Sequence, residues 1–321
     1  MPVVPVPDRF AQIATKVRNW GRWGDDDELG TLNLVDDAAR LRAVASVRSG
    51  RSFALGLPLS RSEGIQMGFV PGRENPDRTM IAVNSPLGPD PDWICASEDR
   101  VDMALQCATH WDALAHVSYA GRMYNGFPAS SVTSEGASRC GIHLVKTLVS
   151  RGILLDVART HGVDVLEPGY PISPEDLDAA LDMARVTLEP GDIVLVRTGQ
   201  MVHLALSGNT SLGPGRDLVA YTWPTPGLTM ATAEWFHAHD VAAVATDTLP
   251  LEVFPGEDED IYLPVHVLHL VEMGMTQGQN WVLDELAQAC FDDSSYSFFL
   301  DASPLPFTAG LGSPLNPVAV K

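Results

Sequence analysis

The chain has 321 residues, of which 45% are hydrophobic and 19% are charged, a balance typical of a compact globular protein. Its 21 Lys and Arg against 41 Asp and Glu give a formal net charge of −20, which repels polyanions and argues against nucleic acid as a partner. No apolar run is long enough to cross a bilayer, and the Pro-rich start lacks the features of a signal peptide. We therefore expect a cytoplasmic protein without a membrane partner.

The domain organisation is predicted from what the chain lacks. It has no internal repeat, charge block or Ser/Gly linker, and this favours a single domain over residues 1–321. Within it we expect a helical N-terminal extension over residues 1–50 and a Pro-rich C-terminal arm over residues 303–321, which could be exchanged between subunits. The four cysteines are far apart without a CxxC pair, so we expect reduced, buried thiols.

In chain order, apolar spacing predicts a helix over residues 8–20 and a second helix capped by Asp36. The acidic run 25–28 between them is interpreted as an exposed loop without chemistry. Apolar runs bounded by Gly, Pro or Asp predict buried strands at 52–59, 152–157, 193–197, 241–246 and 297–300. Further helices are predicted from Ser173, which has the signature of a cap, and at 229–239, 265–273 and 283–290. Strands that alternate with helices indicate an α/β fold.

Two common classes of enzyme are disfavoured by missing motifs. No glycine-rich phosphate loop follows any predicted strand, and the chain has no Gly-x-Ser-x-Gly elbow. Nucleotide chemistry and serine hydrolysis therefore lose support.

One short segment, residues 106–116, concentrates residue types used in catalysis. A helix would place Gln106 and His110 nearly opposite Asp112 and His116, whereas an extended chain points even-numbered residues the same way. We therefore predict a strand that runs into a loop. Two imidazoles and a carboxylate suit a divalent ion such as zinc or manganese, and an unligated His could remove a proton from water. The alternative from the residues alone is that His110 and Asp112 merely bond each other while His116 lies in the core.

This segment resembles the signature His-x-Gly-Thr-His-x-Asp-x-Pro-x-His of the cyclase family, which includes kynurenine formamidase and isatin hydrolase. Thr109, His110, Asp112 and His116 match it, whereas Gln106 replaces the first ligand His, Ala108 the Gly and Leu114 the Pro. Segments that resemble the family's larger bacterial members cover nearly the whole chain. The resemblance implies an α/β fold, a swivelling β/β/α domain with a central mixed, barrel-like sheet and outer helices, and a homodimer or homotetramer.

A second part of the family site implies a late His followed thirteen residues on by a Glu. Here His266 stands at the first position and Gln279 at the second. Because Gln106 and Gln279 each replace a stronger ligand, we expect at most one divalent ion, manganese or zinc. The resemblance implies that His110 and Asp112, together with Gln106, bind it, and that His116 and His266 are catalytic.

Aromatic side chains near these motifs could form the wall of a pocket for a flat, ring-shaped substrate, a small molecule. Trp111 and Tyr124 are the aromatic candidates for substrate binding, and Gln279 is a third. Arg197, at the end of a predicted strand, could hold a substrate carboxylate, but pairing with one of the many acids is favoured.

The favoured function is a metal-dependent hydrolase of an amide, cyclic amide or lactone carbonyl, in which His116 activates a metal-bound water. One alternative is a metal-free cyclase or dehydratase that uses His116 and Asp112. Another is a non-catalytic binder of small molecules.

Overall fold

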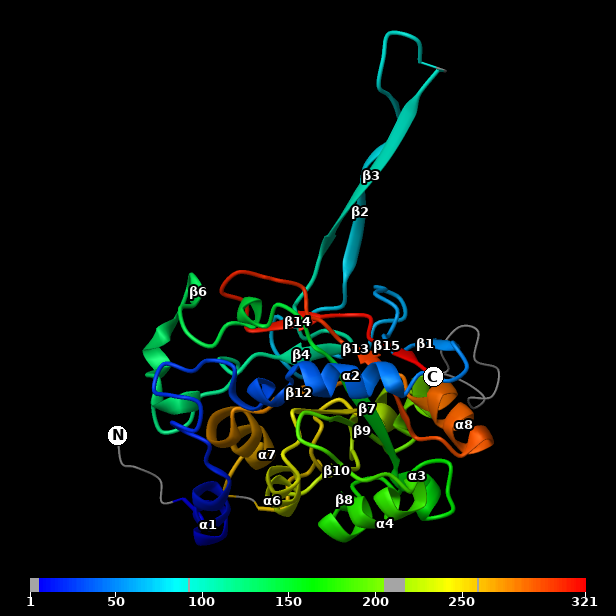
Figure 1. Ribbon diagram of the computed structural model, residues 1–321. Helices are drawn as coiled ribbons and strands as arrows, with labels where there is room; N and C mark the ends of the chain where they lie inside the picture. Colours follow the sequence, from blue (N-terminus) through cyan, green and yellow to red (C-terminus); the bar gives the residue numbers. More distant parts are fainter. Residues whose placement is uncertain (1–5, 92, 205–216, 259) are drawn as a thin grey trace.

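A computed structural model describes residues 6–91, 93–204, 217–258 and 260–321, so the first five residues of the Pro-rich start lie outside the described part. The body is built on a mixed nine-stranded sheet in the order β1-β15-β13-β7-β9-β11-β12-β4-β14, with helices packed outside it (Figure 1). The predicted α/β class and the mixed, curled sheet are confirmed. Within the described ranges no helix has both the length and the apolar character needed to span a bilayer.

The strands are β1 (Ser52–Ala54), β2 (Asp77–Pro86), β3 (Cys95–Asp102), β4 (His110–Asp112), β5 (Val132–Thr133), β6 (Gly136–Ala137), β7 (Val149–Asp156), β8 (Pro171–Ile172), β9 (Ile193–Arg197), β10 (Gly227–Leu228), β11 (Ala243–Thr246), β12 (Thr276–Gln279), β13 (Ser297–Asp301), β14 (Gly312–Pro314) and β15 (Val318–Val320). The α-helices are α1 (Asp8–Val17), α2 (Asp37–Ala45), α3 (Val157–Thr160), α4 (Pro174–Ala184), α5 (Leu218–Thr222), α6 (Ala231–Ala238), α7 (Pro264–His266) and α8 (Asp284–Asp293). Short 3₁₀ turns are η1 (Gly30–Leu34), η2 (Tyr124–Gly126), η3 (Ala129–Ser131), η4 (Ile142–Leu144) and η5 (Gln200–Leu204), and η6 (Val267–Met273) is a π-helix.

The centre of the sheet is parallel and buried on both faces. Strands β7, β9, β11 and β12 run parallel, and the sequence is almost continuously apolar in β9, in β11 and from Ile153 to Leu155 of β7. Successive residues of β7 enter different cores: Ile153 and Leu155 pack toward α1, α4 and α6, whereas Leu154 packs toward α8. The predicted strands at these positions are therefore confirmed, and the helices cover both faces of the sheet.

The helix ends follow their predicted caps. The Asp36 side chain accepts a hydrogen bond from the Ala39 backbone at the start of α2. Ser173 and Asp176 form a reciprocal capping box at the start of α4. The helix predicted over 265–273 is instead a short α7 that continues as the π-helix η6. The acidic run also has a structural role, because Asp27 accepts hydrogen bonds from Gly30 N and Tyr124 Oη, each at 2.9 Å.

The C-terminal tail adds two strands to this chain's own sheet. β15 lies between β1 and β13, and β14 pairs with β4 at the far edge. The end of the chain thus supports the strand that carries the 106–116 motif.

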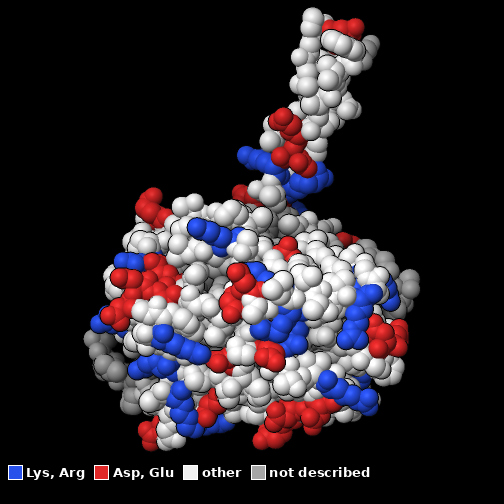
Figure 2. Space-filling model, in the orientation of Figure 1, with Lys and Arg blue, Asp and Glu red and all other residues white. Residues whose placement is uncertain are grey.

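Strands β2 and β3 form a two-stranded arm that projects from the body (Figures 1 and 2). Nearly all its residues are exposed, including the apolar side chains of Met80, Ile81, Val83, Ile94 and Val101. Cys95 begins β3 and is exposed, which corrects the expectation that all four thiols are buried; Cys107, Cys140 and Cys290 are buried, and all four are free.

Candidate active site

The short strand β4 brings the central residues of the motif onto one face of the sheet. It pairs antiparallel with β12, so that Asp112 lies opposite Gln277 and His110 opposite Gln279. Directly paired residues project to the same side of a sheet. Two residues of the motif and two glutamines therefore share one buried surface, as the predicted strand conformation required.

Asp112 is fully buried and lies at the centre of this surface. Its Oδ2 accepts hydrogen bonds from Gln279 Nε2 at 2.9 Å and Gln277 Nε2 at 3.3 Å. Gln277 is itself fixed, because His269 Nδ1 lies 3.1 Å from Gln277 Oε1. Neutral amides, and no Lys or Arg side chain, make the short contacts to this carboxylate within the described part of the chain.

The other oxygen of Asp112 faces two imidazoles. His110 Nε2 lies 3.4 Å and His116 Nε2 lies 3.7 Å from Asp112 Oδ1. His110 Nδ1 lies 2.7 Å from the Ala108 carbonyl and must donate to it, which leaves Nε2 with a free lone pair. Among the described residues, neither His110 Nε2 nor Asp112 Oδ1 has a hydrogen-bond partner, although both are buried. Buried polar atoms are rarely left in this state.

His266 approaches Asp112 from the end of α7. Its Nε2 lies 3.1 Å from Gln279 Nε2 and 4.0 Å from Asp112 Oδ2. On its other side, His266 Nδ1 makes a short hydrogen bond with Glu252. Glu252 is fixed in turn by the backbone N–H groups of Val265 and His266, each at 3.0 Å. A carboxylate behind an imidazole orients the ring and makes its far nitrogen more basic.

The environment shifts the three site pKa values in different directions. Burial alone would raise the pKa of Asp112, but the positive potential of His116 and His110 outweighs it and lowers the pKa. Burial lowers the pKa of His116, and Asp112 offsets only part of this effect. Burial also acts against a charged His266, but the hydrogen bond that the ring donates to Glu252 outweighs it and raises the pKa. His116 is thus the less basic of these two imidazoles, and His266 the more basic one.

Gln106 lies over the same part of the sheet, above β14. Gly312 pairs with Asp112, and a Cβ added at Gly312 would meet Gln106 Nε2 at 2.7 Å. The glycine therefore leaves the space that the Gln106 amide fills. The structure places Gln106, His110, Asp112, His116, His266 and Gln279 in one neighbourhood.

A divalent ion would need several of these atoms. No group of three or more His, Cys, Asp or Glu side chains in the described ranges stands close enough together to hold a metal ion. Two atoms nevertheless suit a cation: His110 Nε2 and Asp112 Oδ1 are buried, have free lone pairs and lack partners. These two donors fit a divalent ion, and the amide oxygen of Gln106 would be a weaker third ligand.

Two of the predicted substrate-binding residues lie elsewhere. Trp111 is between His110 and Asp112 in β4, so it projects to the opposite face, where it packs on Trp281 and donates to the Ala302 carbonyl at 2.8 Å. Tyr124 is fully buried in a separate apolar cluster, and its hydroxyl binds Asp27. Both expectations are wrong because the side chains belong to the core.

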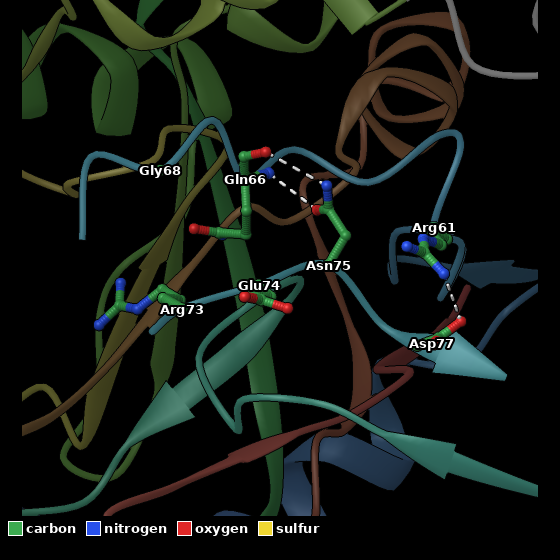
Figure 3. Close-up of a pocket in the computed structure, with 7 residues that line it drawn as sticks. All are labelled: Arg61, Gln66, Gly68, Arg73, Glu74, Asn75 and Asp77. Carbon is green, nitrogen blue, oxygen red and sulfur yellow. Dashed lines mark hydrogen bonds and ion pairs between the residues drawn. The ribbon is translucent and has the colours of Figure 1, made fainter. Parts of the chain in front are cut away.

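Arg73 is a neighbour of the site that the sequence interpretation missed. It lies on the loop between β1 and β2 and lines a pocket of about 320 Å³ together with Arg61, Gln66, Gly68, Glu74, Asn75 and Asp77 (Figure 3). Gln66 Nε2 donates to the Cys107 carbonyl at 2.9 Å and so attaches this loop to the motif. Glu252 and Gln277 were also missed as site residues, because their roles depend on contacts between distant segments. No local pattern marks Arg73; for Gln277, the two-residue spacing from Gln279 was the available signal.

The fold and the site define an α/β protein with a mixed sheet that carries a buried cluster of histidines and a carboxylate on one face. The chain matches the family described as putative cyclase over residues 52–253. A crystal structure described as a novel cyclase is 35% identical with a TM-score of 0.85, over 96% of this chain and 99% of that one. The protein therefore belongs to the cyclase family.

More distant solved structures share the fold. Isatin hydrolase A from Ralstonia solanacearum is 20% identical with a TM-score of 0.60, over 84% of this chain and 92% of that one. A predicted metal-dependent hydrolase from Bacillus stearothermophilus is 16% identical with a TM-score of 0.50, over 84% and 97% of the two chains. A comparison with curated proteins gives no match.

Proposed function

We propose that this cyclase-family protein is a hydrolase that cleaves the bond between the carbonyl carbon and the nitrogen of an amide or cyclic amide, or the ring oxygen of a lactone, with the help of one divalent ion. The observation that carries the proposal is the convergence of His110 Nε2 and His116 Nε2 on Asp112 Oδ1, with two of these atoms buried and unpartnered. The fold shared with an isatin hydrolase and a predicted metal-dependent hydrolase supports this reaction class.

His110 and Asp112 would hold the ion, with Gln106 as a weaker third ligand. A nitrogen donor beside a carboxylate suits manganese or zinc better than calcium. When bound, such an ion polarises the carbonyl oxygen and makes a nearby water more acidic. Gln279 holds Asp112 by its other oxygen, so that Oδ1 stays directed at the two imidazoles.

His116 would move the proton. Its lowered pKa keeps the ring neutral at pH 7, so Nε2 has a lone pair to accept the proton of the attacking water. Asp112, 3.7 Å away, stabilises the imidazolium that results. As the C–N or C–O bond breaks, the same proton passes to the leaving nitrogen or oxygen. His266, with Glu252 behind it, is the second basic group beside Asp112.

A metal-free cyclase or dehydratase is the second candidate. The lack of a three-residue metal cluster in the described ranges favours it, as do the amides of Gln106 and Gln279. In that case His116 and Asp112 would carry out acid and base chemistry without an ion.

The test combines metal content with turnover of isatin, an aryl formamide and a γ-lactone by protein purified without chelator. Asp112→Ala should lose both metal and activity, because it removes the central ligand. His116→Ala should keep the metal and lose activity by about 10²- to 10⁴-fold, the usual contribution of a general base. His161→Ala, the same change on the surface, is the control.

Full activity of either site variant would contradict the mechanism. Turnover without stoichiometric metal would favour the metal-free candidate. No turnover of any compound and no metal would favour a non-catalytic binder.

We also propose that the protein is a homodimer or homotetramer. The arm formed by β2 and β3 supports this, because an isolated two-stranded hairpin is at best marginally stable in water and this one exposes apolar side chains on both strands. Light scattering should give at least twice the monomer mass, and replacing the arm by a short turn should lower it.

A further inference from the structure

Arg73 is held beside the site by a loop that is closed at its base. Gln66 N donates to Asn75 Oδ1 at 2.8 Å, and Asn75 Nδ2 donates to the Gln66 carbonyl at 3.2 Å (Figure 3). The side chain of Gln66 then ties the closed loop to Cys107, three residues before His110. The position of Arg73 is therefore coupled to the catalytic segment although the two are far apart in sequence.

The guanidinium of Arg73 is half-buried. Within the described part of the chain it makes no side-chain hydrogen bond or ion pair, and Figure 3 shows it extended away from the other residues of the pocket. Arg61, in the same pocket, differs because it pairs with Asp77 at 3.2 Å. Burying a charged guanidinium without a partner costs free energy. A chain of net charge −20 has many carboxylates, any of which could have evolved to pair with Arg73.

The charge of Arg73 acts on the site. Burial lowers its pKa, while the negative charge of Asp112 is the first influence that raises it. In the opposite direction, the charge of Arg73 lowers the pKa of both His116 and His266. Arg73 thus lies in the electrostatic field of the residues that would carry the reaction.

We propose that Arg73 binds a carboxylate group of the substrate, next to the carbonyl that is attacked. This rests on the proposed function and narrows it to substrates that are themselves anions. A guanidinium pairs with a carboxylate through two parallel hydrogen bonds, and so fixes the orientation of a planar ligand as well as its charge. In the pocket, Gln66 would be an uncharged neighbour of the ligand, and the Arg73 guanidinium would attract the carboxylate.

Equilibrium binding tests this assignment independently of turnover. The probes are phenylacetate and its neutral counterpart phenylacetamide, titrated by calorimetry into the full-length protein. Wild type should bind phenylacetate more tightly, and Arg73→Gln should weaken that binding by about 10- to 100-fold while leaving phenylacetamide unchanged. Arg73→Lys, which keeps the charge but loses the paired donors, should fall between them. Arg48→Gln, at an exposed arginine outside the pocket, is the control and should bind as wild type does.

The assignment is wrong if wild type shows no preference for the carboxylate, or if Arg73→Gln keeps that preference. The second readout uses a carboxylate-bearing lactone and its methyl ester. Arg73→Gln should raise KM for the acid alone and leave kcat within about threefold; an equal loss of kcat for both compounds would mean that Arg73 stabilises the reaction and not the substrate anion. Failure to hydrolyse the lactone, isatin and the aryl formamide alike, with the phenylacetate preference intact, would overturn the proposed function and leave the carboxylate site standing.

Discussion

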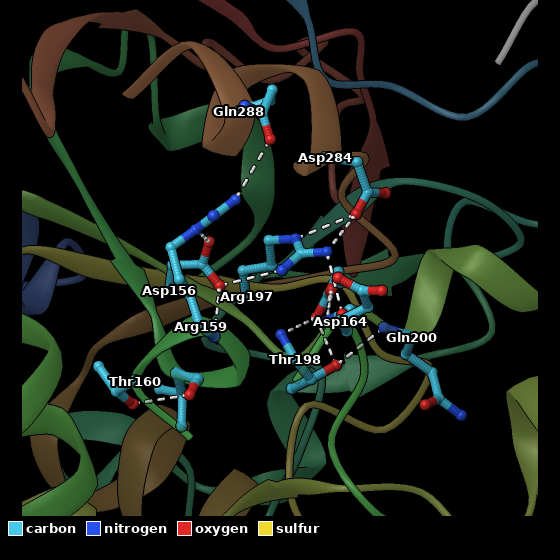
Figure 4. A network of polar contacts seen from close by, with 12 residues as sticks. Asp156, Arg159, Thr160, Asp164, Arg197, Thr198, Gln200, Asp284 and Gln288 are labelled. Carbon is cyan, nitrogen blue, oxygen red and sulfur yellow. Dashed lines mark hydrogen bonds and ion pairs between the residues drawn. The ribbon is translucent and has the colours of Figure 1, made fainter. Parts of the chain in front are cut away.

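Two clusters of buried polar residues in the described part of the chain differ in the groups that contact their carboxylates. The first, which we call the Arg197 network, consists of Asp156, Arg197 and Asp284, which Figure 4 labels, together with Asp247, which binds the turn after β9. Arg197 pairs with Asp156 at 3.0 Å and with Asp284 at 2.8 Å. Asp247 accepts backbone hydrogen bonds from the turn that follows β9, including one of 2.8 Å from Gly199. A cation or a backbone donor is provided for each carboxylate, although one oxygen of Asp284 has no partner in the described ranges.

The second cluster, around Asp112, has no Lys or Arg side chain in contact with the carboxylate in the part of the chain that the structure describes. Two glutamine amides bind one oxygen of Asp112, while the other oxygen and the facing His110 nitrogen lack partners among the described residues. In parallel sheets the carboxyl ends of the strands are the usual place for ligands, yet here the Arg197 network closes those of β7 and β9. The site therefore differs from the scaffold in that an unpartnered carboxylate oxygen faces an unpartnered imidazole nitrogen, with no cation between them among the described residues.

The largest expected effect comes from removing the cation of the closed cluster. Arg197→Met removes the cation shared by Asp156 and Asp284, so that Asp284 loses its ion pair and Asp156 keeps only Arg159. This should lower the free energy of unfolding by about 3–5 kcal/mol. Urea denaturation measures it. Asp112→Asn is the matched comparison: it should change stability by less than about 1 kcal/mol, because its carbonyl still accepts from the glutamines, and should abolish turnover. Equal stability losses in the two variants would show that the clusters do not differ.

A smaller effect is expected when a carboxylate is added to the open cluster. Gln279→Glu places a second negative charge where an amide now donates to Asp112, and without metal this should cost about 2–3 kcal/mol. Manganese or zinc should restore the loss, since binding to the folded state alone at about 100 times Kd contributes about 2.7 kcal/mol. Thermal melts with and without metal measure the recovery. Gln277→Glu, also beside Asp112, is the control, and an equal recovery there would mean that the metal responds to charge alone.

The sequence predicted the parts of this comparison that depend on local patterns. Apolar runs located β7, β9, β11 and β13, and the pairing of Arg197 with acids was favoured and is found. Alternation along an extended chain correctly placed His110 and Asp112 on one face. The same rule, applied to Trp111, would have assigned it to the core.

The elements and site residues that the sequence did not predict are either exposed or depend on contacts between distant segments. The arm of β2 and β3 is exposed on both faces, so no apolar alternation marks it. β14 and β15 lie in a Pro-rich tail whose pairing partners come much earlier in the chain. Arg73 and Glu252 reach the site only through tertiary packing, and nothing in their neighbouring residues indicates it.

The clusters should also differ in their response to acid, which is the smallest effect we expect. His269 holds Gln277 in place, and burial lowers the pKa of its imidazole to about 3. An unfolded His takes up a proton near pH 6.5, whereas the folded protein cannot do so until about pH 3, so acid favours the unfolded state between these values.

Between pH 6.5 and pH 5 this single group should reduce the free energy of unfolding by about 2 kcal/mol. His269→Asn keeps a donor for Gln277 but does not titrate, so its urea denaturation at pH 7 and pH 5 should show a correspondingly smaller loss. His161→Asn, on the surface, should retain the wild-type loss. If His269→Asn remains as acid-sensitive as wild type, the sensitivity arises outside the Asp112 cluster; if it does not, the neutral imidazole that positions Gln277 accounts for it.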